Sequence, residues 1–322
     1  MKRATPIFHP ALPAPALVWV ALMFFVAGCA SDEHYETIDF DDTVRELRTE
    51  QSQQEGNVLR VAVGAMISPE KTIENYQELI EFIGREAGLA TRIVQRKTYE
   101  EVNELIKRGD VDIAFICTGP YILGKRDGGF EALATPVVRG EPYYQAYLIV
   151  HRDSPHETLS DLSGKIFAFT DPVSNTGAAV PTQWVAELGE TPETFFDRVH
   201  YTYSHDNSIM AVAASLVDGA SIDGHIWEYY DQTNPENTSR TRIIRRSEPY
   251  GSPPLVASAQ LADGIKIRIR DAILEMHDSD AGAQILENLM IDRFVAPKDE
   301  WYETALITNR LTDSNSGDDE AY

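Results

Sequence analysis

Short apolar runs alternate along the chain with longer segments in which apolar residues recur every three or four positions. The runs at residues 58–65, 90–96 and 111–118 have the length of buried strands. Residues 68–89 and 99–109 have the apolar spacing of amphipathic helices. The order strand, helix, strand, helix, strand predicts a parallel sheet covered by helices.

The helix predicted over residues 68–89 carries a signal at each end. Ser68 is a typical N-cap residue, and Pro69 stands at the first helical position. Gly88 ends the helix. The apolar residues between them fall at helical spacing: Ile73, Tyr76, Leu79, Ile80 and Ile83.

A second round of the same pattern follows. It predicts strands within residues 143–153 and 161–171, helices over 179–188 and 206–219, and a short strand with a helix over 220–231. The chain then returns through an extended segment, residues 240–258, to closing helices over 265–277 and 281–290 that pack on the first half. Two crossing segments, near residues 141–150 and 242–256, are expected to serve as hinges. The predicted lobes are residues 58–146 with 243–310, which form lobe one, and residues 147–242, which form lobe two.

The first 28 residues have the pattern of a secretory signal. Lys2 and Arg3 precede an apolar stretch over residues 16–27, which at 12 residues is too short to cross a bilayer. The stretch closes on VAGC, which resembles a bacterial lipobox and predicts lipidation at Cys29. An ordinary signal peptide with a chance cysteine is the alternative.

The segments that flank the predicted lobes are polar and acidic. Residues 29–57 are expected to form a flexible tether with one helical turn near Thr43–Arg48, and residues 311–322 a disordered tail. Residues 1–28 contain two of the 28 basic residues and none of the 51 acidic ones, so the remainder has a formal charge of −25. This charge argues against nucleic acid and anionic lipid surfaces as partners.

Cys117 is the second of two cysteines, and we expect it to be an inert core residue in a buried strand. The eight histidines are scattered, and the chain contains neither an H-x-x-x-H nor a C-x-x-C motif. The sequence therefore predicts neither a metal site nor a cofactor.

Residues 171–181, DPVSNTGAAVP, form a turn rich in hydrogen-bond donors between a strand and a helix. The first N–H groups of a helix lack internal partners and carry partial positive charge, so they can hold an anion. Ser174 and Thr176 add hydroxyls, Asn175 adds an amide, and Gly177 allows close approach of the backbone. A helix start capped by its own hydroxyls is the alternative interpretation.

Three further polar groups follow predicted strands. Thr118 and Tyr121 lie in CTGPY, His205 begins a helix after Ser204, and Asp223 ends an apolar segment in IDGHIW. Ligands of parallel α/β sheets lie beyond the carboxyl ends of the strands, so these groups would converge on one cleft. Asp223 would accept a proton or an ammonium from the ligand. A surface cap at His205 and a solvated loop aspartate at Asp223 are the alternatives.

From about Val58 to Met290 the chain resembles the phosphate/phosphite/phosphonate-binding proteins of ABC importers. The segments that carry the resemblance are SPEKTIENYQELIEFI, GDVDIAFICTGPYIL, YLIVHRDSPHETLSDLSGKIFAFTDPVSNTGAAVP, YSHDNSIMAVAASLVDGASIDGHIW and EPYGSPPLVAS. The resemblance implies a type II periplasmic binding protein: two α/β lobes with mixed, mainly parallel sheets that close about a hinge.

The resemblance also implies a set of ligand contacts. The hydroxyl-rich loop of the family, which grips the oxyanion, corresponds to Ser174, Asn175, Thr176 and Gly177, with an amide at Asn175 where relatives often have a hydroxyl. The family histidine and aspartate correspond to His205 and Asp223, and contacts from lobe one to Thr118 and Tyr121. Tyr76 and Tyr144 are further candidates for the cleft wall.

The expected function is that of a monomeric, lipid-anchored receptor outside the inner membrane that captures a small phosphorus oxyanion and delivers it to an ABC permease. Phosphate, phosphite and phosphonates all remain open as ligands. An accessory protein of a membrane sensor kinase or cyclase is the alternative from another class. A hydrolase using Ser174, His205 and Asp223 is a remote one, because no G-x-S-x-G elbow surrounds the serine.

Overall fold

A computed structural model describes residues 58–64 and 66–308, all of which fall in one compact unit spanning residues 54–322. The predicted signal peptide, Cys29, the acidic tether with its helical turn, and the tail at 311–322 lie outside the described residues. Within the described ranges, no helix combines the length and the hydrophobicity that a membrane crossing requires.

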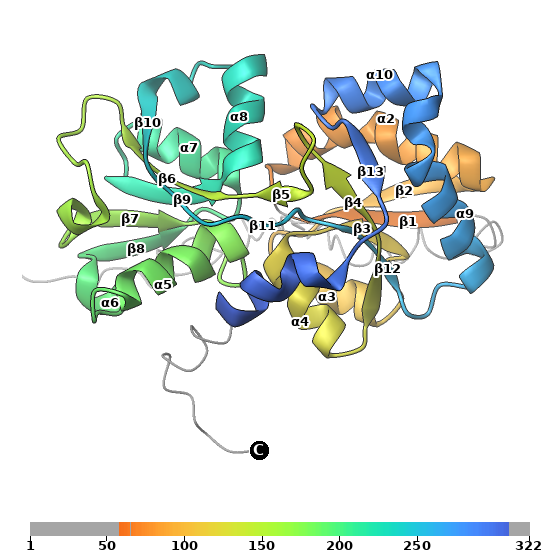
Figure 1. Ribbon diagram of the computed structural model, residues 1–322, viewed down its shortest axis with the longest axis horizontal. Coiled ribbons are helices and arrows are strands. Elements are labelled where there is room, and N and C mark those ends of the chain that lie inside the picture. The colour runs from red at the N-terminus through yellow and green to blue at the C-terminus, as the bar shows by residue number, and fades with distance from the viewer. Residues whose placement is uncertain (1–57, 65, 309–322) are drawn as a thin grey trace, which may run out of the picture. The chain divides into compact units, whose positions relative to one another are not determined.

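The first sheet has six strands in the order β13-β4-β12-β3-β1-β2. Its strands are β1 (Val58–Val63), β2 (Ala90–Val94), β3 (Ile113–Phe115), β4 (Phe130–Val137), β12 (Leu255–Ser258) and β13 (Arg293–Val295). The helices that belong to it are α2 (Pro69–Ala87), α3 (Tyr99–Lys107), α4 (Thr118–Arg126), α9 (Asp263–Leu274) and α10 (Asp280–Asn288), with short helices η5 (Met276–Asp278) and η6 (Asp299–Tyr302). We call this sheet and its helices the first lobe (Figure 1).

The second sheet has five strands in the order β10-β6-β9-β7-β8. Its strands are β6 (Ala146–His151), β7 (Ile166–Phe169), β8 (Arg198–Tyr201), β9 (Gly219–Asp223) and β10 (Thr241–Arg246). Its helices are α5 (Val180–Ala186), α6 (Pro192–Phe195), α7 (His205–Ala213) and α8 (Gly224–Thr233), with short helices η2 (Leu159–Leu162), η3 (Asn175–Ala179) and η4 (Thr238–Arg240). We call this part the second lobe.

Both main sheets are mixed, but parallel pairings do not predominate as the sequence led us to expect. Within the described residues, β1 is parallel to β2 and β3, and β7 is parallel to β8 and β9, whereas the other pairings are antiparallel. The parallel pairs arise from strand–helix–strand units. Strands β6 and β12 enter their sheets directly from the crossing segments, without an intervening helix, and run against their neighbours.

Two short strands join the lobes. Strand β5 (Tyr143–Tyr144) pairs antiparallel with β11 (Tyr250–Gly251), and Figure 1 shows this pair between the two main sheets. Both strands fall inside the predicted crossing segments. Ala146 and residues 243–246, which the sequence assigned to lobe one, are paired in the second sheet. The change of lobe therefore occurs at the β5–β11 pair.

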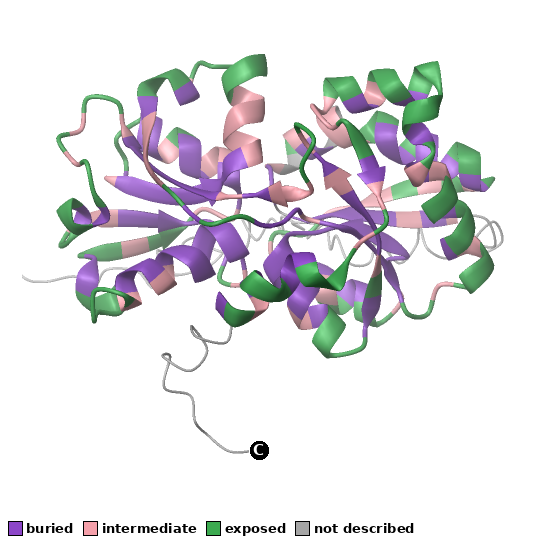
Figure 2. Cartoon of the chain, in the orientation of Figure 1, coloured by how far each residue is buried: buried purple, intermediate pink, exposed green. Residues whose placement is uncertain are grey.

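The central strands of both lobes are buried, the edge strands β2, β8 and β10 are partly exposed, and the outer faces of the helices are exposed (Figure 2). Helix α2 ends as predicted at Gly88, which adopts the left-handed conformation with φ of 70°. Cys117 is buried and makes no disulfide in the described part of the chain. Several of the largest fully buried side chains lie close to the crossing, among them Tyr144 and Tyr250.

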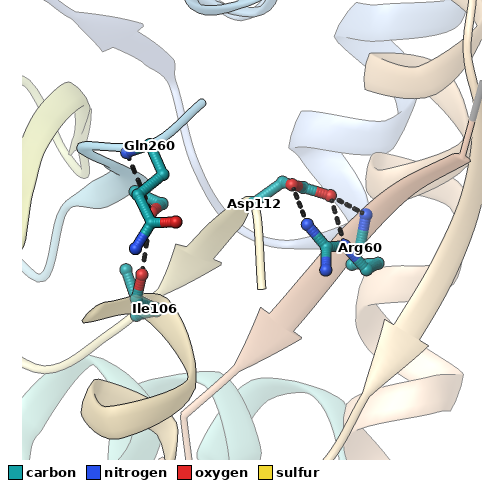
Figure 3. A network of polar contacts seen from close by, with 5 residues as sticks. Arg60, Ile106, Asp112 and Gln260 are labelled. Atoms are coloured by element: carbon teal, nitrogen blue, oxygen red, sulfur yellow. Dashed lines mark hydrogen bonds and ion pairs between the residues drawn. The ribbon is translucent and has the colours of Figure 1, made fainter. Parts of the chain in front are cut away.

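An ion pair between Asp112 and Arg60 links the start of β3 to β1 in the first sheet. Asp112 accepts hydrogen bonds from the backbone N–H of Arg60 at 2.7 Å and from its guanidinium at 2.6 and 2.9 Å (Figure 3). The backbone carbonyl of Asp112 also accepts from the N–H of Ser258 on β12. These contacts hold three adjacent strands in register. Cys117 and Thr118 follow the opposite end of β3.

Candidate binding site

The donor-rich turn of residues 171–179 follows the end of β7, and all of it except Pro172 and Val173 is buried. Ser174 is its N-cap, and the Ser174 hydroxyl accepts from the N–H of Gly177 at 3.1 Å. Residues 175–179 form a π-helical turn, η3, before α5 begins, a wider start than the simple α-helix that we expected. Such π turns are rare and occur frequently at functional sites.

Gly177 serves the packing of this turn. A Cβ atom at Gly177 would lie 1.5 Å from the hydroxyl oxygen of Thr170 and 3.0 Å from that of Ser174. Glycine is therefore required because the turn folds tightly onto the end of β7. The sequence interpretation had assigned this close approach to a ligand, whereas the described contacts are internal.

Thr176 is attached to the central strand β9 through its carbonyl oxygen. The hydroxyl of Ser221, on β9, donates to that carbonyl at 2.6 Å. The Thr176 hydroxyl itself is buried and has no hydrogen-bond partner among the described residues. An unpaired buried hydroxyl is costly, so this group marks a position where a polar ligand atom would be stabilised.

His205 lies at the start of α7, and its ring is oriented by the same strand. The N–H of Asp223, at the end of β9, donates to His205 Nδ1 at 3.0 Å. Because Nδ1 accepts, the proton of the neutral ring is on Nε2. Burial lowers the pKa of His205 to about 3, which keeps the ring neutral. Nε2 has no partner in the described residues, so His205 presents a free N–H donor.

Asp223 ends β9 and caps α8. Its Oδ1 accepts from the N–H groups of His225 at 2.8 Å and Ile226 at 3.3 Å. Burial raises the pKa of Asp223 to about 7, although these two bonds lower it in part. At neutral pH the carboxyl therefore exists in both protonation states and can either donate to an oxyanion or accept from a protonated one.

The charge of Asp223 acts on three tyrosines of the first lobe and the crossing. Burial and then the charge of Asp223 raise the pKa of Tyr76, and the same two causes are among those that raise the pKa values of Tyr99 and Tyr144. The Tyr99 hydroxyl is buried without a hydrogen-bond partner in the described ranges. Sequence reasoning missed Tyr99, although the capping box at Thr98 marks another strand-to-helix corner there.

Of the two candidates from the first lobe, Thr118 and Tyr121, the structure places Thr118 against the crossing. Thr118 begins α4 and donates to the carbonyl of Gly251 in the crossing at 2.8 Å. Tyr121 lies one turn further along α4, with its ring edge-on to Tyr302 at 4.7 Å. The ammonium of Lys125 lies 5.8 Å from the Tyr121 ring, so the described ring contacts of Tyr121 are with η6 and its own helix.

Direct contacts join the two lobes around the site. The N–H of His205 donates to the carbonyl of Met66, and the amide of Asn175 donates to the Tyr144 hydroxyl at 3.3 Å. The thiol of Cys117 lies 3.9 Å from the Ser174 hydroxyl. Ser174, Asn175 and His205 therefore contact groups of the first lobe and the crossing, which corresponds to a closed arrangement.

Comparison with known proteins identifies the family. A family model described as "ABC transporter, phosphonate, periplasmic substrate-binding protein" matches residues 61–302. The chain belongs to this family. Members of the phosphonate-binding family are solute-binding proteins of ABC transporters, and the sequence resemblance is thereby confirmed.

Two curated relatives are each 28% identical to the chain. One is the phosphonates-binding periplasmic protein of Escherichia coli K12, over 178 residues that cover 54% of this chain and 52% of the relative. The other is the phosphate-import protein PhnD of Mycolicibacterium smegmatis, over 224 residues that cover 66% and 68%. The match with the first relative thus spans about half of that protein's length.

Solved structures of this family share the fold. A binding protein component of an ABC phosphonate transporter from Pseudomonas aeruginosa gives a TM-score of 0.75 at 22% identity, over 82% of this chain and 90% of that one. PhnD1 of Prochlorococcus marinus, in complex with methylphosphonate, gives 0.72 at 15% identity, over 80% and 98%. The two-lobed fold of type II periplasmic binding proteins, predicted from the sequence, is therefore confirmed.

Proposed function

We propose that the chain is the lipid-anchored solute receptor of an ABC importer and captures a small phosphorus oxyanion between its lobes. The observation that carries the proposal is the orientation of His205. Its Nδ1 accepts from the Asp223 N–H, so a neutral Nε2–H is available in a buried position, as is the unpaired hydroxyl of Thr176. Neutral donors fixed in a buried site stabilise an anion without a counter-charge.

The proposed ligand contacts come from both lobes. In the second lobe they are Ser174, Asn175, Thr176, Gly177, His205 and Asp223. In the first lobe they are Thr118 and Tyr99, with Tyr99 in the role that the sequence gave to Tyr121. About five to eight such bonds, each with a net value of roughly 0.5–1.5 kcal/mol and more to a charged acceptor, support micromolar or tighter binding.

The nature of the relatives supports a phosphorus oxyanion as the ligand class. The names of these relatives refer to phosphonates and to phosphate import, and one solved structure contains methylphosphonate. Asp223, with a pKa raised to about 7 by burial, suits anions that ionise near neutral pH, because one of the two partners can supply a proton to the shared hydrogen bond. Sulfate carries no such proton and would face a carboxylate.

A hydrolase is disfavoured by the same geometry. The histidine of a serine triad donates its Nδ1–H to a carboxylate and accepts from the serine at Nε2. Here His205 Nδ1 accepts a backbone N–H, and the Ser174 hydroxyl accepts from Gly177. Ser174, His205 and Asp223 are therefore better explained as ligand contacts.

Lipidation at Cys29 and delivery to a membrane permease complete the proposal. Metabolic labelling with a fatty-acid analogue tests the anchor, and Cys29→Ser should abolish the label and release the protein from membranes. The permease partner would be tested by uptake of the ligand in cells with and without the chain.

Isothermal titration calorimetry of the purified chain tests the ligand class. Phosphate, phosphite and methylphosphonate are titrated against sulfate as the control anion. We expect at least one phosphorus oxyanion to bind at micromolar or lower concentration and sulfate to bind at least tenfold more weakly. Equal binding of sulfate, or binding of none of the four, would contradict the proposal.

A further inference from the structure

A pocket of about 400 Å³ lies between the lobes, beside the start of α7. Arg96 and Lys97 line it from the loop between β2 and α3, and Tyr203 and Ser204 line it from the loop between β8 and α7. The rest of its wall is formed by Val63, Ile67, Thr72, Gln95, Thr202 and Asn207. We call it the basic pocket, because it contains two cations and no aspartate or glutamate is among the described residues that line it.

The two cations of the basic pocket form no ion pair with a carboxylate in the described part of the chain. The Arg96 guanidinium donates to the carbonyl of Gln95 at 2.7 Å, and the Lys97 ammonium lies 4.3 Å from the centre of the Tyr203 ring. Glu101 accepts from the backbone N–H of Lys97 at 3.0 Å and so caps α3. Arg96 and Lys97 are both exposed. Two uncompensated positive charges therefore stand together in a chain with a formal charge of −25 beyond residue 28.

The basic pocket adjoins the proposed oxyanion contact at His205. Ser204 directly precedes His205 and caps α7, because its hydroxyl accepts from the Asn207 N–H at 3.3 Å. On the first lobe, Ile67 follows Met66, whose carbonyl accepts from the His205 N–H at 3.0 Å. The residues next to this contact on both lobes therefore belong to the wall of the pocket.

Separation of the lobes would join the basic pocket to the start of α7. Three contacts near the pocket cross from one lobe to the other: His205 with Met66, Asp206 with Ser68, and Lys97 with Tyr203. Residues of β5 and β11 do not line the pocket, so movement of the lobes about this pair would part the three contacts and widen the pocket. An anion attracted to Arg96 and Lys97 would then reach the end of α7 where His205 lies.

We propose that the basic pocket is the entrance through which the oxyanion reaches its site, and that Arg96 and Lys97 attract it against the negative charge of the rest of the chain. This inference rests on the proposed function. A cleft lined by charges of one sign raises the local concentration of the opposite ion and speeds association, and added salt screens the effect. Charges at the rim of a binding site change mainly the association rate, whereas buried contacts set the dissociation rate. Arg96 and Lys97 therefore govern how fast the oxyanion binds and not how long it stays.

Stopped-flow tryptophan fluorescence of the full chain tests the inference. The ligand is whichever of phosphate, phosphite and methylphosphonate binds most tightly. At about 0.01 M salt, where the screening length is about 30 Å, we expect Arg96→Gln combined with Lys97→Gln to lower the association rate constant about three- to tenfold. At about 1 M salt, where this length is about 3 Å, the difference should fall below about twofold. The dissociation rate constant should stay within about twofold under both conditions.

Arg270→Gln combined with Lys298→Gln is the matched control. This pair removes two positive charges from exposed positions of the first lobe that do not line the pocket. Lys298 also lies over an aromatic ring, that of Trp301, as Lys97 lies over Tyr203. The association rate constant of the control should stay within about twofold of that of the unmodified chain, because exposed charges far from the ligand path are screened.

A third variant separates entry from closure. Tyr203→Asn removes the ring under Lys97 without changing the charge, and asparagine tolerates the left-handed backbone of Tyr203, which has φ of 58°. We expect this variant to keep the association rate constant of the unmodified chain. A fall as large as that of the Arg96 and Lys97 variant would show that Lys97 acts through its contact with the second lobe, and would overturn the inference.

The other outcomes separate the inference from the proposed function. An unchanged association rate in the Arg96 and Lys97 variant at low salt, or an equal fall in the control pair, would overturn the entrance assignment while the oxyanion site stands. Complete loss of binding in that variant would also contradict it, because charges at an entrance do not hold the bound ligand. Failure of all three anions to bind the unmodified chain would overturn the proposed function and this inference together.

Discussion

Asp223 and His205 are buried neighbours whose pKa values shift in opposite directions. Burial raises the pKa of Asp223 from 3.8 to about 7, so between these values the folded state binds one proton more than the unfolded state. Burial lowers the pKa of His205 from 6.5 to about 3, so over that range the folded state binds one proton fewer. As pH rises, Asp223 therefore lowers the free energy of unfolding and His205 raises it, and the two effects oppose each other between about pH 4 and 6.5.

Replacing one of the two groups should reveal how the other changes stability with pH. We expect Asp223→Asn to become progressively more stable than the unmodified chain from pH 4 to 7, by at most about 1.4 kcal/mol per pH unit. His205→Gln should show the opposite trend from pH 3 to 6.5. Urea denaturation at pH 4, 5.5 and 7 measures both. A stability difference that does not change with pH would show that Asp223 has an ordinary pKa.

The two unpaired donors should account for a large part of the affinity. We expect Thr176→Ala and His205→Ala each to weaken binding of the tightest phosphorus oxyanion by about 1–3 kcal/mol, because a charged acceptor loses a bond in a buried site. Calorimetry measures the change. Thr233→Ala and His277→Ala are matched controls at exposed positions and should leave affinity unchanged. Unchanged affinity in both site variants would remove these residues from the site.

The sequence indicated most of the candidate residues on the second lobe, but fewer of those on the first lobe. Ser174, Thr176, His205 and Asp223 follow strands, and the sequence shows those strand ends directly. Tyr99 was missed although the capping box at Thr98 marks its corner, because the sequence does not show that this corner meets Asp171 of the second lobe. Tyr121 was assigned by resemblance, but it lies one helical turn beyond the strand end, where α4 faces η6.

At the scale of elements, the N-termini of two helices in the first lobe donate hydrogen bonds to carboxylates of the second lobe. Asp206 accepts from the N–H of Ser68, the N-cap residue of α2, at 3.0 Å, and Asp171 accepts from the N–H of Tyr99, the first residue of α3, at 3.1 Å. The N-terminus of a helix carries partial positive charge, so both contacts favour the closed arrangement.

The contact at α2 should contribute to affinity without touching the ligand. We expect Asp206→Asn to weaken oxyanion binding about two- to tenfold, since a carboxylate at a helix N-terminus contributes about 0.3–1 kcal/mol and more when partly buried. Asp280→Asn is the control, because Asp280 stands in the first turn of α10 and is exposed. Calorimetry at low and high salt distinguishes the two variants. An equal loss of affinity in both would contradict a role in closure.

A glycine on α4 sets how closely the lobes approach. A Cβ atom at Gly119 would lie 2.2 Å from the carbonyl oxygen of Val173 in the second lobe. We expect Gly119→Ala to weaken ligand binding at least tenfold while the melting temperature of the ligand-free protein changes little, because the clash forms only on closure. Gly264→Ala is the control, since nothing lies within 4 Å of a Cβ there. A marked fall in the melting temperature of ligand-free Gly119→Ala would assign the glycine to stability instead.

The elements themselves were largely evident from the pattern of apolar residues. Helices α2 and α3, strands β1 and β2, and the strand–helix unit of β9 and α8 lie where periodicity and capping residues indicated. The pairing direction was not evident, because antiparallel pairing of β12 with β3 and β4 depends on how the chain re-enters the first sheet. The π-helical turn likewise depends on the packing of Gly177 against Thr170.

At the scale of the whole molecule, the crossing couples hinge and site. Thr118 binds the carbonyl of Gly251 on β11, and Asn175 binds the Tyr144 hydroxyl on β5. The turns that carry the proposed ligand contacts therefore also contact the crossing. A ligand that holds both turns would shift the population toward the closed arrangement.

Small-angle scattering should detect this shift. We expect saturating methylphosphonate to reduce the radius of gyration of the chain, and the same ligand to cause a smaller reduction or none in Gly119→Ala. The comparison is made at ligand concentrations that saturate each protein. An unchanged radius in the unmodified chain would indicate that the lobes are closed before the ligand arrives.

Because of its position, the reactivity of Cys117 can report separation of the two lobes. The sulfur is fully buried and lies 3.8 Å from the hydroxyl of Tyr144 on the crossing and 3.9 Å from that of Ser174 on the opposite lobe. Separation of the lobes would uncover it. The rate at which a thiol reagent alkylates Cys117 would then count opening events in the native molecule, and a bound solute would slow that rate in proportion to the time it spends enclosed.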